Sequence, residues 1–106
     1  MPEYVLTSGA EDDLDKIVAY TTTRWGAGQA QRYGSELNRH FQSLVDDRAR
    51  TKLVFEGWPE LQMSRCEHHY VFSIRQTAAP MAILAVLHEH MDLPTRLRAR
   101  LNEDRR

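Results

Sequence analysis

Two apolar segments separated by a short turn dominate the C-terminal half of the chain. Residues 69–75 alternate between apolar and mixed positions, whereas residues 81–87 form an almost unbroken apolar run. A short run without a polar face is typical of a strand buried on both sides. Pro80 ends the intervening turn, and it suits the entry to a strand because proline cannot donate a ladder hydrogen bond. Residues 67–92 therefore predict the centre of the fold.

The N-terminal half carries helical periodicity instead. After a short strand predicted at residues 3–6, apolar residues recur every three or four positions across residues 8–23 and again across residues 29–46. Ser8 begins a capping-box pattern and predicts the start of the first helix. Glycines between the two stretches predict a tight connection, so the helices should form an antiparallel hairpin with Trp25 filling its corner.

The remaining segments complete an α+β pattern. Residues 52–55 offer a short extended piece, residues 61–66 a further strand, and the tail a short helix whose apolar contacts are Leu97 and Leu101. Strands follow the helices rather than alternating with them, which predicts the order β-α-α-β-β-β with a short C-terminal helical tail. The hairpin should pack on one face of an antiparallel sheet, with the first strand beside the strand at residues 81–87.

Length and composition narrow the class of protein. The 106 residues predict one domain, residues 1–106, and the net charge of −1 gives no basic field for sequence-specific nucleic-acid binding. Cys66 is the single cysteine, so neither an intramolecular disulfide nor a multi-cysteine zinc site can form. There is no secretory signal and no apolar run of membrane-spanning length, so we expect a cytoplasmic protein without membrane attachment or cofactor.

Polar residues with possible chemistry gather where the last strand ends. A lone His-x-His pair without a located third ligand does not predict a metal site. One hypothesis is RNA cleavage by an acid, a base and a phosphate-binding arginine drawn from Glu56, Arg65, His68, His88 and His90. The alternative is that these residues are surface groups on neighbouring strands, with Arg65 in a cross-strand ion pair.

Two residues at this end also have a structural interpretation. Asp92 directly precedes the predicted tail helix and should cap it by accepting amide hydrogen bonds. His88 should close the strand by donating to a neighbouring carbonyl or carboxylate.

A protein-binding surface is the competing interpretation for the whole chain. Aromatic residues and arginines dominate interface hot spots, and the tail is a basic amphipathic segment. The predicted partner-binding residues are Trp25, Trp58, Arg96, Leu97, Arg98, Arg100 and Leu101. A frayed, solvated helix is the alternative for the tail. The titratable groups are scattered rather than convergent, which favours a binding protein over an enzyme.

Three segments resemble the ParE toxins of the RelE/ParE superfamily. The first runs from Tyr4-Val5-Leu6-Thr7 through Arg24-Trp25-Gly26 to Leu37, the second is His69-Tyr70-Val71-Phe72, and the third is Val86-Leu87-His88-x-x-Met91-Asp92. They occur in the family's order and extend over residues 4–92.

The resemblance implies the toxin of a type II toxin–antitoxin module, associated with plasmid stabilisation. ParE-like toxins act on DNA gyrase and block replication, and a ParD-like antitoxin neutralises them in a hetero-oligomeric complex. RelE-like and YoeB-like relatives on the same fold instead cleave messenger RNA in the ribosome, so the fold leaves both activities open. Ala85 stands where family members often carry an arginine, which counts against the nuclease. Ser73 and Ile74 replace a Tyr-Arg pair, so an inert relative that only binds its antitoxin is a third interpretation.

Overall fold

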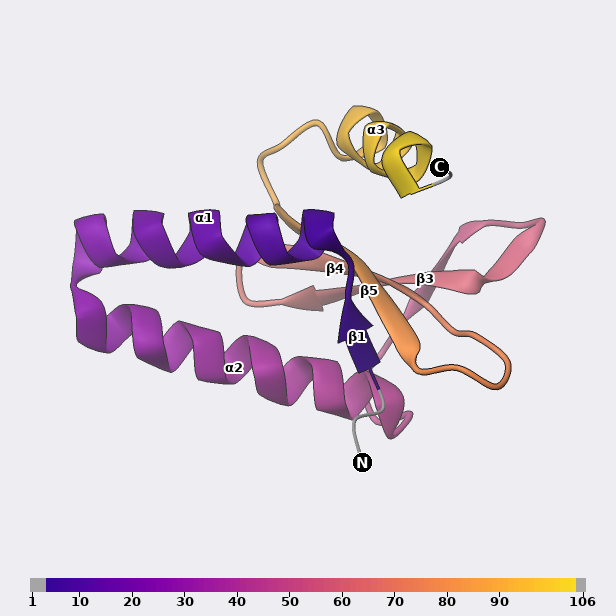
Figure 1. The fold of residues 1–106 in the computed structure, drawn as a ribbon, viewed down its shortest axis with the longest axis horizontal. Helices are drawn as coiled ribbons and strands as arrows, with labels where there is room; N and C mark the ends of the chain where they lie inside the picture. Colours follow the sequence, from indigo (N-terminus) through magenta and orange to yellow (C-terminus); the bar gives the residue numbers. More distant parts are fainter. Residues whose placement is uncertain (1–3, 105–106) are drawn as a thin grey trace.

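A five-stranded sheet with helices on both faces forms the molecule (Figure 1). The computed structural model describes residues 4–104. The elements in chain order are β1 (Tyr4–Leu6), α1 (Ser8–Trp25), α2 (Ala27–Val45), β2 (Lys52–Phe55), β3 (Trp58–Cys66), β4 (His69–Ile74), β5 (Met81–His88) and α3 (Leu93–Asp104). Glu3, which the sequence analysis includes in the first strand, lies outside the described residues. No helix in residues 4–104 is long and apolar enough to span a membrane.

The α+β class and the antiparallel meander are confirmed. The strand order is β1-β5-β4-β3-β2, so β1 lies beside β5 as predicted. β1 pairs with β5 in parallel, which makes the sheet mixed rather than wholly antiparallel. The segment Lys52–Phe55 is a full strand at the opposite edge, and β3 begins at Trp58 rather than at residue 61. β3 pairs with β2 from Trp58 to Met63 and with β4 from Leu61 to Cys66, which explains its length because every part of the strand has a hydrogen-bonding neighbour.

The helical hairpin is confirmed, but two details of it differ from the prediction. Thr7, not Ser8, is the N-cap of α1, since its side chain accepts a hydrogen bond from the Ala10 amide. Gly26 alone connects the helices, with a φ of 95° that favours glycine. Because a single residue makes the reversal, Trp25 stays in the last turn of α1 and is 67% exposed, so the prediction that it fills the corner is wrong.

Apolar side chains form one cluster on each face of the sheet. Adjacent strand residues point to opposite faces, so Val71 packs against the hairpin and Phe72 packs against α3. The hairpin contributes mainly Leu37, Phe41 and Leu44 to the first cluster. Leu97 of α3 is 5% exposed over the second cluster, where burying such a side chain stabilises the fold by about 1.5–3 kcal/mol. The predicted apolar face of the tail helix is therefore confirmed.

A β-bulge in β5 creates backbone groups that no strand can satisfy. Phe72 pairs with Ala85 while Ser73 pairs with Ile83, which leaves Leu84 as the extra residue. β1 ends beside this point. The Thr7 hydroxyl donates to the Leu84 carbonyl over 3.2 Å, in place of a strand amide.

An ion pair between the first and last helices completes this edge. Asp13 of α1 accepts from the Val86 amide over 2.9 Å and from both terminal nitrogens of Arg100 over 2.8 and 2.9 Å. Arg100 of α3 also donates to the Leu84 carbonyl over 2.9 Å. Its side chain crosses Gly9 so closely that a Cβ there would lie 2.6 Å from Arg100 Cδ. These contacts join α3 to both α1 and β5.

Candidate functional site

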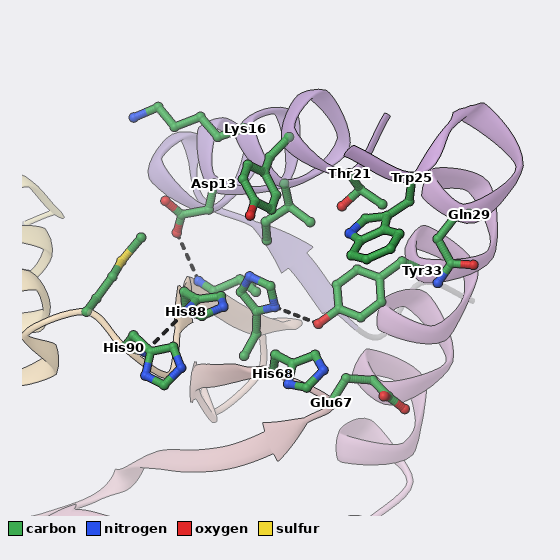
Figure 2. A pocket seen from close by; sticks show the side chains of 15 residues that line it. Asp13, Lys16, Thr21, Trp25, Gln29, Tyr33, Glu67, His68, His88 and His90 are labelled. Carbon is green, nitrogen blue, oxygen red and sulfur yellow. Dashed lines mark hydrogen bonds between the residues drawn. The ribbon is translucent and has the colours of Figure 1, made fainter. Parts of the chain in front are cut away.

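A cavity of about 920 Å³ opens between the part of the helical hairpin near its Gly26 connection and the end of the sheet at residues 67–69 and 86–91. Figure 2 shows Trp25 and Tyr33, from the hairpin, opposite His68, His88 and His90, from the sheet end. Aromatic and aliphatic residues make up much of the lining, together with four histidines and a few polar or charged residues. The lining residues are Asp13, Lys16, Ile17, Tyr20, Thr21, Trp25, Gln29, Tyr33, Glu67, His68, His69, Val86, His88, His90 and Met91.

A chain of ring contacts forms one wall of the cavity. The Tyr33 hydroxyl lies 2.5 Å from Nδ1 of the buried His69. The His69 ring meets the His88 ring edge-on at 5.2 Å between centroids, and the His88 and His90 rings lie 5.1 Å apart. The His90 amide donates to His88 Nδ1 over 3.1 Å. His88 therefore accepts a hydrogen bond at Nδ1, a contact that the sequence analysis did not predict.

The inner members of this chain are held neutral near neutral pH. Burial, and then the nearby His88 and His68, lower the pKa of His69 to about 4. Burial raises the pKa of the Tyr33 phenol to about 12. A general acid or base works best when its pKa is near the ambient pH. Tyr33 and His69 are therefore poorly suited to proton transfer at neutral pH.

A second polar cluster surrounds Glu89, just after β5. Glu89 forms an ion pair with Arg65 and lies 3.1 Å from His68 Nδ1. The hydrogen bond with His68 is the main cause that lowers the pKa of the Glu89 carboxyl, and the charge of Arg65 acts in the same direction. Arg65 also donates to the Tyr70 hydroxyl over 3.1 Å and lies over its ring. Arg65 does form a cross-strand ion pair, although its partner Glu89 was not among the residues predicted from the sequence.

The five residues of the nuclease hypothesis do not converge. Arg65, His68, His88 and His90 lie at one end of the sheet, whereas Glu56 lies in the β2–β3 turn next to Trp58. Arg65 lies seven positions after Trp58 along β3, which corresponds to roughly 23 Å. The long β3 strand therefore places the predicted carboxylate at the opposite end of the sheet from the histidines.

The predicted partner-binding residues fall into exposed and enclosed groups. Trp25, Arg96 and Arg98 are exposed. Trp58 and Leu101 are half-buried against the α3-side cluster, and Leu97 is buried within it. Arg100 is engaged by Asp13 inside the molecule.

The described residues contain no group of three or more His, Cys, Asp or Glu side chains that could hold a metal ion. Burial raises the pKa of the Cys66 thiol to about 11. This thiol is therefore a weak nucleophile, since the thiolate is the reactive form.

Comparison with known proteins decides the family. Residues 4–93 match the family model described as the ParE toxin of the type II toxin–antitoxin system parDE. The chain belongs to the ParE toxin family. "Toxin ParE" from Escherichia coli is 45% identical over 101 residues, which cover 95% of this chain and 98% of that protein. The resemblance inferred from three short segments is thereby confirmed.

A solved structure supports the ParE fold independently. It is described as the chromosomal ParDE TA system from P. aeruginosa, and it superposes with a TM-score of 0.66. The match covers 83% of this chain and 96% of that chain at 17% sequence identity, so it bears on the fold alone. This ParE-family chain is accordingly the toxin component of a type II toxin–antitoxin system.

Proposed function

We propose that this ParE-family toxin inhibits DNA gyrase and so blocks replication, and that a ParD-like antitoxin neutralises it in a cytoplasmic hetero-oligomeric complex. Family membership supports the toxin role and an antitoxin of the ParD type. The proposal describes a protein-binding inhibitor, which needs neither a cofactor nor a catalytic residue of its own.

The observation that favours a binding toxin over a nuclease is the burial of β5. RelE-like nucleases, which the sequence analysis kept as an alternative, commonly carry basic residues on this strand. Here Leu84 and Ala85 are fully buried and Leu87 is 3% exposed, in an apolar cluster beneath α3. β5 therefore offers no arginine or lysine to an RNA phosphate, and α3 covers this face of the strand.

The mRNA endoribonuclease remains a second candidate because of one specific feature. Arg65, His68, His88 and His90 do meet at one end of the sheet. An arginine and exposed histidines in this arrangement could bind a phosphate and exchange a proton. The experiment therefore has to separate the two activities directly.

The test measures both activities with the same purified toxin. We expect it to inhibit supercoiling of relaxed plasmid by gyrase and to leave ribosome-bound messenger RNA intact. The double variant Arg65→Ala, His68→Ala should inhibit gyrase as the parent does. Cleavage of messenger RNA that this double variant loses, together with unaffected supercoiling, would make the nuclease the correct function.

The antitoxin is tested by expression in cells. Expression of the toxin alone should stop growth, and co-expression of the neighbouring reading frame should restore it. Normal colony numbers at verified soluble expression would identify an inert relative. Arg96 and Arg98 are exposed on α3, so an acidic partner should associate more slowly at high salt.

A further inference from the structure

We propose that β2 binds the β2 strand of a second copy of this chain, so that two sheets join edge to edge across a twofold axis at Val54. The contact involves the β2 edge of the sheet only, so gyrase inhibition can fail without affecting it. The support comes from the open strand edge, from exposed apolar side chains on it, and from a charge pattern that complements itself.

The outer side of β2 is an open edge of the sheet. β2 is the last strand in the sheet order and pairs with β3 as its one described neighbour. It lies at the end of the molecule away from the hairpin connection at Gly26 (Figure 1). Successive residues of a strand direct their backbone groups to alternate sides, so part of the N–H and C=O groups of β2 face away from β3. Such an edge is a template for a further strand.

Two large apolar side chains lie exposed on this edge strand. Leu53 is 52% exposed and Phe55 is 48% exposed. Val54, between them, packs against the cluster on the α3 side of the sheet. Because adjacent strand residues point to opposite faces, Leu53 and Phe55 share the other face. Natural edge strands usually carry charged residues that prevent pairing, so two neighbouring apolar side chains here indicate a surface that a partner covers.

The sequence of β2 complements itself in an antiparallel arrangement. A twofold axis at Val54 places Val54 opposite its own copy, Leu53 opposite Phe55, and Lys52 opposite Glu56, which directly follows the strand. Opposite residues of an antiparallel pair point to the same face. One face would therefore bring together two leucines and two phenylalanines, and the other a pair of valines between two ion pairs. Each contact occurs twice, as a twofold interface requires.

The charges select this register and favour a second copy over an unrelated strand. A shift by two residues in one direction would place Lys52 opposite Val54 and Phe55 opposite Thr51, and the opposite shift would place Glu56 opposite Val54. Only the register centred on Val54 pairs both charges and all the apolar side chains. The matching pattern is present in this chain itself, whereas a foreign strand would have to supply it independently.

The size of the contact predicts a weak dimer. A strand of four residues gives an interface below the usual size of permanent complexes. The cavity lining contains no residue of β2, so the dimer would leave the cavity of each copy open. The two copies would therefore associate reversibly without covering the candidate functional site.

The test is sedimentation equilibrium of the purified toxin from about 5 µM to about 1 mM. We expect a reversible increase of the mass from 12.3 kDa toward twice that value, with a dissociation constant of about 100 µM or lower. A monomer mass over the whole range would overturn the proposal. Assemblies larger than a dimer would also contradict it, because a twofold contact closes on itself.

Exchange of the two charges tests the register. Lys52→Glu and Glu56→Lys each place like charges opposite one another, so each variant should dimerise about tenfold more weakly or worse. An equimolar mixture of the two variants should form a heterodimer, because every charge of one variant then faces the opposite charge of the other. The double variant Lys52→Glu, Glu56→Lys should recover the parent affinity. Both side chains are exposed, so circular dichroism should show the native fold in every case.

Variants at other exposed positions provide the controls. Phe55→Thr retains a residue suited to a strand and should weaken the dimer by about tenfold. Val5→Thr is its matched control, since Val5 is 46% exposed on β1 at the other edge of the sheet. Arg39→Glu is the charge control, since Arg39 is 72% exposed on α2. Both controls should dimerise as the parent does.

Three further results would overturn the proposal. Unchanged dimerisation in both single charge variants would place the contact on another surface. Failure of the mixture and of the double variant to restore the dimer would exclude the register centred on Val54. Losses in the two controls equal to that of Phe55→Thr would show that the edge at β2 has no particular role.

Discussion

Replacing Asp13 by alanine should detach α3 from the body of the toxin and lower the free energy of unfolding by about 3–5 kcal/mol. The side chains of Asp13 and Arg100 are only 10% and 14% exposed, so water can do little to replace the lost contacts. The substitution removes the bidentate carboxylate from the largely buried Arg100 guanidinium, which keeps only the more distant and exposed Glu103, 3.6 Å from its Nε, as an ion-pair partner. It also leaves the Val86 amide without its acceptor, which alone costs about 1–3 kcal/mol.

The loss is measured by urea unfolding at pH 7, followed by far-UV circular dichroism. In a thermal melt each kcal/mol corresponds to about 4–8 °C for a domain of this size, so the midpoint should fall by more than about 12 °C. Asp13→Asn keeps an acceptor for Val86 and should lose less stability. Asp12→Ala is the matched control, because Asp12 is exposed on the same helix and its removal should cost less than about 1 kcal/mol.

A double-mutant cycle separates this ion pair from unrelated damage. Asp13→Ala combined with Arg100→Met removes both charges, so the double variant should be more stable than the sum of the single losses by about 1–3 kcal/mol. Strict additivity would refute the reasoning. So would an Asp13→Ala variant that loses less than about 1 kcal/mol, because the pair would then be structurally incidental.

Asp92→Ala should lower the free energy of unfolding by about 1 kcal/mol. Asp92 caps the start of α3, where it accepts hydrogen bonds from the Thr95 amide over 3.4 Å and from the Thr95 hydroxyl over 2.8 Å. An unchanged urea midpoint would contradict this capping role. His88→Gln should retain most of the toxicity in a growth assay, since His88 makes a structural contact with the His90 amide; toxicity lost by a fully folded variant would instead favour proton transfer. The native pKa of His69 is about 4 and its unfolded value is near 6.5, so the unfolded state binds the proton first and stability falls as the pH drops from about 6.5 to about 4. The loss amounts to about 3 kcal/mol, and a His69→Gln variant with the same pH dependence in urea titrations would contradict the assignment.

The pattern of apolar residues predicted most of the fold because it reflects which face of each element is buried. The hairpin, the meander, the position of β1 beside β5 and the cap at Asp92 all follow from such local signals. The bulge at Leu84 could not be predicted, since residues 81–87 are apolar throughout and contain no alternation whose interruption would show an extra residue. The parallel direction of β1 relative to β5 could not be predicted either, because it depends on how the hairpin packs on the sheet.

The candidate site was less predictable because its contacts are long-range. His68, His88 and His90 were identified as polar residues at strand ends, and they do lie near one another. Glu89 was missed as the partner of Arg65, since the two residues lie two strands apart in the sheet. Trp25 was assigned to a corner because two glycines suggested a longer connection than the single Gly26 that exists.

The ion pair between α1 and α3 has a consequence for how the toxin is made. Its partners are 87 residues apart, so a ribosome delivers Asp13 well before Arg100. Before Arg100 is synthesised, its hydrogen bond to the Leu84 carbonyl of β5 cannot form, and α3 does not yet cover the apolar face of the sheet. Chains that stop short of Arg100 therefore expose a strand edge, which is the kind of surface that aggregates and attracts proteases. Only a chain translated beyond Arg100 can form the ion pair that closes this part of the fold.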